Sequence, residues 1–160
     1  MQIGKLTALN SKESSDMLER IAGHWNIESG FVRKIKNSYF FLKNRDNRVF
    51  AVSRKIAELE LGHLKINSIG LYVAEVHNNF VRLSVEGSQM FGGEAKANVV
   101  GLDDDEIRRW IVGEDVERKS RVGKEFVIIK NANDFFGCGK ITEEKIINYF
   151  PKQRRLEEIS

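Results

Sequence analysis

The stretch EFVIIKNANDFFGCGKI, residues 125–141, decides the fold of the C-terminal half of this chain. It contains two runs rich in β-branched and aromatic residues, 125–130 and 134–142, which are separated by the turn-forming residues 131–133. A third run of this kind follows at 145–150. Short strands joined by tight turns predict a small, partly closed β barrel rather than the parallel sheet of an α/β fold.

One helix is expected beside these strands, because LDDDEI at residues 102–107 has the pattern of a helix start. Asp103 is placed to cap the first-turn amides, and Glu106, three residues on, to reach back to the cap. The acidic residues also complement the positive end of the helix dipole. A metal site is the alternative reading, but capping accounts for every residue of the run. We therefore expect a strand at 97–101 and then a helix that ends at Gly113.

The N-terminal half predicts a different mixture of helices and strands. A first helix is expected over residues 14–25, where Ser14, Ser15 and Asp16 are capping candidates. Turns are expected at 27–30 and 44–47, strands at 38–42, 48–53, 64–76 and 80–83, and short helices at 53–61 and 84–91.

The double glycine Gly92–Gly93 is the only one in the chain, and it predicts the domain boundary. We expect residues 1–92 to form an N-terminal α/β module and residues 93–160 to form a small β pseudo-barrel with one helix, an α+β protein in all. A length of 160 residues suits two small domains. The single proline excludes a proline-rich linker between them.

Charge and composition limit the kinds of partner that the chain can have. The formal net charge of +3 permits an RNA partner if the positive side chains cluster, but it does not demand one. The single cysteine excludes an intrachain disulfide and a zinc site made of thiolates. The N-terminal sequence MQIGKLTALN has no signal pattern, and no apolar run approaches the length of a membrane span. A cytoplasmic protein without a membrane partner is expected.

Few residues suggest catalytic chemistry. The histidines His24, His63 and His77 have no partners at metal-ligand spacing, so we expect packed or surface residues rather than metal ligands. Cys138 stands between two glycines and is expected to be a small buried thiol rather than a nucleophile. No catalytic residue, metal or cofactor is therefore predicted.

The sequence Gly137-Cys138-Gly139-Lys140 superficially resembles a phosphate loop. The flanking residues are strand residues, however, and the longer glycine-rich stretch of a true phosphate loop is missing. Glycines in a strand commonly allow the close approach of another backbone, which would belong here either to the protein or to a nucleic acid.

The most informative functional segment is NYFPKQRR, residues 148–155, which combines basic and aromatic side chains. This combination suits phosphate neutralisation together with base stacking. The alternative is a solvated tail, with Tyr149 and Phe150 packed in the core. Arg108, Arg109 and the segment 118–124 add positive charge to the same half.

Three segments together resemble the C-terminal PUA-like domain of the Sun/RsmF family of RNA cytosine-5 methyltransferases. They are Gly113-Glu114-Asp115, the strand pair EFVIIKNANDFFGCGKI with its Gly-x-Gly-Lys, and the end IINYFPKQRRL at 146–156. The segment YFFLKNRDNRVFAVSRKIAEL at 39–59 is similar to the module that precedes PUA domains in that family. The resemblance covers about residues 31–156.

The resemblance implies RNA binding through the PUA-like domain. The positions that match the family pattern and are candidate RNA contacts are Lys140, Asn148, Lys152, Arg154 and Arg155. We expect the four basic residues to contact phosphate, Asn148 to be either a contact or a structural residue, and Gly137 and Gly139 to be structural.

The departure from the family decides the expected function. The methyltransferases carry a large cofactor-binding catalytic domain with cysteines in Pro-Cys and Thr-Cys settings, and this chain has no room for such a domain. It looks like a free-standing, non-catalytic RNA-binding portion that acts on rRNA or tRNA during RNA modification or ribosome biogenesis. The alternative is an adaptor that supplies an RNA-binding half to a separate RNA methyltransferase or to a pre-ribosomal particle. A small hydrolase finds no support in the sequence.

Overall fold

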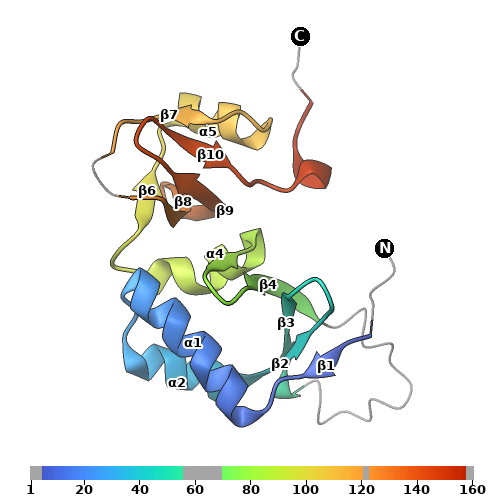
Figure 1. The fold of residues 1–160 in the computed structure, drawn as a ribbon. Helices are drawn as coiled ribbons and strands as arrows, with labels where there is room; N and C mark the ends of the chain where they lie inside the picture. Colours follow the sequence, from blue (N-terminus) through green and yellow to red (C-terminus); the bar gives the residue numbers. More distant parts are fainter. Residues whose placement is uncertain (1–4, 56–69, 121–122, 158–160) are drawn as a thin grey trace. The chain divides into compact units, whose positions relative to one another are not determined.

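Helices and strands form two compact units, which confirms the expected α+β class (Figure 1). The computed structural model describes three ranges of the chain: 5–55, 70–120 and 123–157. Unit 1 comprises Met1–Arg82 with Glu94–Lys96, and unit 2 comprises Leu83–Gly93 with Ala97–Ser160. In the described ranges, no helix is long and apolar enough to cross a membrane.

Unit 1 is built on an antiparallel sheet with the helices α1 and α2 in its described residues. Among the described residues, its five strands follow one another in sequence order, β1-β2-β3-β4-β5. The elements of the unit are β1 (Thr7–Ala8), α1 (Ser11–Trp25), α2 (Ser29–Ser38), β2 (Tyr39–Lys43), β3 (Arg48–Ser53), β4 (Leu71–Val76) and β5 (Val81–Leu83). The strands expected at 38–42, 48–53 and 80–83 are confirmed to within about one residue. The helix expected at 53–61 and the first part of the strand expected at 64–76 lie outside the described residues.

The first helix begins earlier than its sequence pattern indicates. The cap is Asn10, whose side chain accepts a hydrogen bond from the Glu13 backbone, and the Glu13 carboxylate accepts one from the Asn10 backbone in return. This reciprocal capping box satisfies two amides at once, so it defines the helix start in place of Ser14, Ser15 or Asp16. The helix ends at Asn26, which adopts a left-handed conformation with φ of 51°.

Helix α2 corrects the turn expected at 27–30. Its N-terminal cap residue, Glu28, accepts no capping hydrogen bond with its side chain, which pairs instead with Lys96 Nζ at 2.8 Å, and Gly30 lies in its first turn. Among its residues only Ile35 is buried. Contacts with α1 stabilise the helix instead, among them a 2.5 Å hydrogen bond from Lys36 Nζ to Ser15 Oγ.

Unit 2 contains the sheet that the sequence predicts, curled into part of a barrel (Figure 1). Its strands stand in the order β6-β8-β9-β10-β7, and every neighbouring pair is antiparallel except β6 with β8. The elements of the unit are α4 (Val85–Phe91), the 3-10 helix η3 (Gly92–Glu94, which continues into unit 1), β6 (Val99–Gly101), α5 (Asp104–Ile111), β7 (Val116–Glu117), β8 (Glu125–Asn131), β9 (Asp134–Ile141), β10 (Lys145–Asn148) and the 3-10 helix η4 (Lys152–Arg154).

The helix start at 102–107 is confirmed as a capping box. Asp103 Oδ1 accepts a 2.8 Å hydrogen bond from the Glu106 backbone, and Glu106 Oε1 accepts one from the Asp103 backbone at 3.1 Å. The helix carries Trp110 into the core of unit 2, where its side chain is fully buried. Burial of so large an apolar side chain is worth roughly 2–3 kcal/mol and fixes α5 against the sheet.

The short helix α4 belongs to unit 2 and packs on β9. Its cap is Ser84, whose Oγ accepts a 2.9 Å hydrogen bond from Gly87, so the helix expected at 84–91 is confirmed. The division into residues 1–92 and 93–160 stays a prediction. The contacts of α4 associate it with the strands that follow the double glycine in sequence.

Candidate nucleic-acid interface

Asn148, one of the five candidate RNA contacts, is hydrogen-bonded inside the protein. Its side-chain amide donates to Trp110 O and to Glu114 O, both at 2.8 Å. Its Oδ1 accepts a 2.7 Å hydrogen bond from the Phe150 backbone. Both amide protons are therefore used to tie the end of β10 to the last turn of α5 and to Glu114 after it, which gives Asn148 a structural role.

Asp115 adds to these contacts between β10 and the end of α5, which we call the junction. Its Oδ1 accepts a 2.8 Å hydrogen bond from the Asn148 backbone, and its Oδ2 accepts one from Lys145 Nζ at 2.9 Å. The backbone hydrogen bond, followed by the one from Lys145, lowers the pKa of the Asp115 carboxyl from its ordinary value. The same ion pair raises the pKa of Lys145.

Arg155 closes the junction from the side of the C-terminal segment. Its Nε donates a 3.1 Å hydrogen bond to Phe150 O, and its side chain lies directly against Gly113. A Cβ on Gly113 would come within 2.8 Å of the Arg155 Cδ and Nε atoms, and Gly113 has a φ of +103°. The backbone conformation favours a glycine here, and the arginine side chain packs directly on it.

The glycines of the Gly-x-Gly-Lys motif are confirmed as structural. A Cβ on Gly139 would lie 2.5 Å from Ile146 Cγ2 and 2.7 Å from Trp110 Cη2. Gly137 has a φ of +82°, and its backbone amide donates a 2.9 Å hydrogen bond to Ser88 Oγ. The neighbours that approach these glycines thus belong to the protein. Cys138 between them is buried, as expected.

Lys140 lies beside an aromatic pair on the sheet. Its Nζ is 5.5 Å from the centre of the Phe126 ring on the neighbouring strand β8. The Tyr149 ring packs edge-on against the same Phe126 ring, with 5.5 Å between the ring centres. Tyr149 is 37% exposed, whereas Phe150 is buried in the core. We call Phe126, Lys140 and Tyr149 the aromatic–lysine patch. It offers a cation and a partly exposed ring to solvent.

The remaining candidates lie on η4. Lys152 is exposed, and Arg154 is exposed with its guanidinium Nη1 2.5 Å from Glu86 Oε1 on α4. The five candidates therefore do not form a single cluster. Lys140 belongs to the aromatic–lysine patch, Lys152 and Arg154 belong to η4, and Asn148 and Arg155 belong to the junction beneath them.

Two contributions were missed by the sequence analysis. Phe126 faces Lys140 because the two residues are Cα partners in the β8–β9 register, which the hairpin could have suggested before the structure was known. Glu86 is 68 residues away from Arg154 in sequence, and no local signal connects them. Arg118, which the sequence offered as added positive charge, forms an ion pair with the acidic start of α5, with its Nη2 3.0 Å from Glu106 Oε2.

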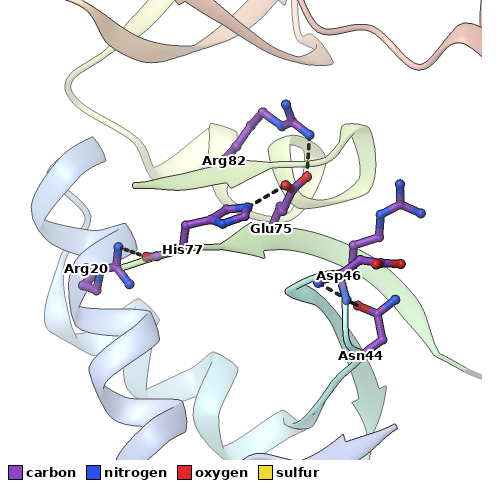
Figure 2. A network of polar contacts seen from close by, with 7 residues as sticks. Arg20, Asn44, Asp46, Glu75, His77 and Arg82 are labelled. Carbon is purple, nitrogen blue, oxygen red and sulfur yellow. Dashed lines mark hydrogen bonds and ion pairs between the residues drawn. The ribbon is translucent and has the colours of Figure 1, made fainter. Parts of the chain in front are cut away.

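Unit 1 contains a separate polar network (Figure 2). The carboxylate of Glu75 lies between two partners, with His77 Nε2 at 2.6 Å and Arg82 Nη2 at 2.5 Å. Arg20 on α1 donates a 2.7 Å hydrogen bond to the backbone oxygen of His77, and the His77 ring stacks on Phe80. These contacts tie the turn after β4 to α1, which is a structural role.

The histidines that the structure describes are packed, as expected. His24 packs edge-on against Trp25, and His77 is held by Glu75 and Phe80. His63 lies outside the described residues. Over the described ranges, no group of three or more histidine, cysteine or acidic residues is arranged to hold a metal ion.

The curled sheet with α5 and the glycine-bearing strand β9 is consistent with a PUA-like domain. Residues 97–156 match the family described as the methyltransferase RsmF PUA domain. The resemblance to the PUA region of RsmF-type RNA methyltransferases is therefore confirmed.

The curated relatives are ribosomal RNA small subunit methyltransferases F. The relative from Vibrio cholerae is 30% identical over 109 residues, which are 68% of this chain and 23% of that protein. The one from Vibrio parahaemolyticus is 25% identical over 90% of this chain and 30% of its own length. The one from Aeromonas salmonicida is 23% identical over 95% of this chain and 30% of its own length. The chain thus spans about a quarter to a third of the length of these relatives.

Proposed function

We propose that this chain is a non-catalytic RNA-binding protein that binds structured rRNA or tRNA through unit 2, in the cytoplasm, during RNA modification or ribosome biogenesis. The observation that carries the proposal is the aromatic–lysine patch, in which a lysine and a partly exposed tyrosine share one phenylalanine ring. Aromatic rings stack on unpaired bases, and a neighbouring cation neutralises phosphate. The PUA match of residues 97–156 supports the same function.

The basic residues of η4 supply further phosphate contacts, and together with the aromatic–lysine patch they make up the RNA-binding surface. Lys152 supplies a point charge, whereas the guanidinium of Arg154 has five N–H donors, of which Glu86 occupies one. Arg154 therefore keeps donors for a phosphate while Glu86 holds its orientation. Asn148, whose two amide donors serve the protein, and Arg155, whose Nε is bonded to Phe150 O and whose side chain packs on Gly113, are assigned to the support of this surface rather than to RNA contact.

The test is binding of the full chain to labelled tRNA and small-subunit rRNA fragments, measured by fluorescence anisotropy. Replacing Tyr149 by leucine keeps an apolar side chain but removes the stacking ring, so affinity should fall by at least about fivefold. Tyr39→Leu, at a half-buried tyrosine of unit 1, is the matched control and should leave affinity unchanged. Absence of binding by the unaltered chain at low salt would refute the proposal.

The second candidate function is an adaptor for a separate RNA methyltransferase or a pre-ribosomal particle. It is favoured by alignments that cover up to 95% of this chain but only 30% of a methyltransferase. In this case the RNA site would be completed by the partner. Weak RNA binding by the chain alone, restored when a purified methyltransferase is added, would favour the adaptor over the self-sufficient RNA-binding protein.

A further inference from the structure

A cavity of about 730 Å³ opens on unit 2 next to the C-terminal segment. Most of its lining is apolar or aromatic: Val85, Ile111, Phe135, Phe136, Phe150 and Leu156. Cavities of this size, lined mainly by apolar and aromatic side chains with a few polar groups, are typical of sites for small molecules.

The walls of the cavity are fixed by contacts within unit 2. The ring of Phe135 lies so close to Gly92 that a Cβ there would be 2.5 Å from it. The Leu156 backbone donates a 3.0 Å hydrogen bond to Ile111 O, which holds the C-terminal wall against the end of α5. The cavity is therefore shaped before any ligand arrives, which lowers the entropic cost of binding.

The polar lining has a specific composition. Gln89 and Asn133 are exposed residues of the lining, and each side-chain amide offers both donors and an acceptor. Arg154 also lines the cavity and is oriented by Glu86. Lys130 Nζ lies 5.8 Å from the centre of the Phe135 ring. The lining thus gathers aromatic rings, two amides, the cation of Arg154 and the carboxylate of Asp134 around one opening, and Lys130 lies outside the lining, beside the Phe135 ring.

We propose that this cavity accepts one unpaired nucleotide of a bound RNA. The base lies among the phenylalanine rings, its hydrogen-bonding edge meets Gln89 and Asn133, and its phosphate meets Arg154. A nucleobase has a flat apolar face and an edge that carries both donors and acceptors, which matches the lining better than an aliphatic side chain does. The inference rests on the proposed RNA-binding function and adds to it a preference for unpaired nucleotides.

The test compares hairpin RNAs that differ by one nucleotide. One hairpin is fully paired, and four others carry a single bulged A, C, G or U in the same stem. The affinity of the unaltered chain for at least one bulged hairpin should exceed its affinity for the paired hairpin by at least about fivefold. The double variant Gln89→Ala/Leu156→Ala should lose this preference, whereas Gln153→Ala, at an exposed residue of η4 outside the cavity lining, should keep it.

The outcomes separate this inference from the proposed function. Equal binding of all five hairpins by the unaltered chain would overturn the cavity inference and leave RNA binding standing. Absence of binding to every hairpin and to the rRNA and tRNA fragments would overturn both.

A titration followed by NMR distinguishes a protein ligand from a nucleotide. Nucleoside monophosphates should shift the side-chain amide signals of Gln89 and Asn133. If a short leucine-rich peptide shifts these signals and none of the four nucleotides does, the cavity is a protein-docking site and the inference is wrong.

Discussion

Replacing Asn148 by alanine should destabilise unit 2 without weakening the RNA affinity of the folded protein. The change removes two donated hydrogen bonds of 2.8 Å and one accepted hydrogen bond of 2.7 Å. The bonds to Trp110 O and from the Phe150 backbone are partly buried, whereas the bond to Glu114 O is exposed, so water can replace only the last one easily. With about 1 kcal/mol for each partly buried bond and a further cost for the partners left unsatisfied, the loss should be about 2–3 kcal/mol.

Hydrogen exchange measured by NMR is the suitable assay, because it reports the stability of unit 2 separately from that of unit 1. A loss of 2–3 kcal/mol should accelerate exchange of the β9 and β10 amides roughly 30- to 150-fold, if these amides exchange through unfolding of the unit. Gln153→Ala, at an exposed residue close in sequence, is the control and should exchange at the rate of the unaltered chain. Unchanged exchange in Asn148→Ala together with a loss of RNA affinity would refute the structural role of this residue.

Three further predictions follow from the site. Gly139→Ala places a methyl group 2.5 Å from a core isoleucine and should cost about 1–3 kcal/mol in thermal unfolding, whereas Gly101→Ala, with open space around it, should be nearly neutral. Glu86→Gln removes the negative charge beside Arg154 and should tighten RNA binding about two- to threefold in anisotropy titrations; weaker binding would mean that orientation of the arginine matters more than its net charge. Because hydrogen bonds lower the pKa of Asp115 in the folded state, its contribution to stability is fully present above a pH of about 4 and is lost as the pH falls through the lower folded value. Urea unfolding of Asp115→Asn should therefore show a smaller decline in stability below a pH of about 4 than the unaltered chain does, and an equal decline would contradict this assignment.

The elements that the sequence predicts well are those with strong local signals. The capping box at Asp103 and Glu106 and the hairpin around residues 131–133 depend on neighbours within a few positions, so the pattern determines them. Helix α2 has no side-chain cap and has Gly30 in its first turn, so its start has the local appearance of a turn. The start of α1 was misplaced because three serine and aspartate residues compete with Asn10 as local caps.

The surroundings of the candidate RNA contacts could be predicted from the sequence only in part, for a physical reason. The sequence shows which side chains are polar or charged, but it does not show which of them have their hydrogen-bonding groups bonded within the folded protein. The partners of Asn148 are 34 and 38 residues away, and only the folded chain brings them within hydrogen-bonding distance. Arg155 depends on Gly113 in the same way. Lys140 was selected for its motif, yet its functional interest comes from Phe126 and Tyr149 beside it.

The salt dependence of RNA binding tests the central claim most directly. The slope of log Kobs against log salt concentration should be shallower by roughly 2–3 in the triple variant Lys140→Ala/Lys152→Ala/Arg154→Ala, because each lost phosphate contact contributes about 0.7–0.9. Arg108→Ala, at an exposed arginine beside the acidic start of α5, is the single-site control and should leave the slope unchanged. A triple variant that keeps the slope and affinity of the unaltered chain would contradict the account and would place the RNA contacts elsewhere on the molecule.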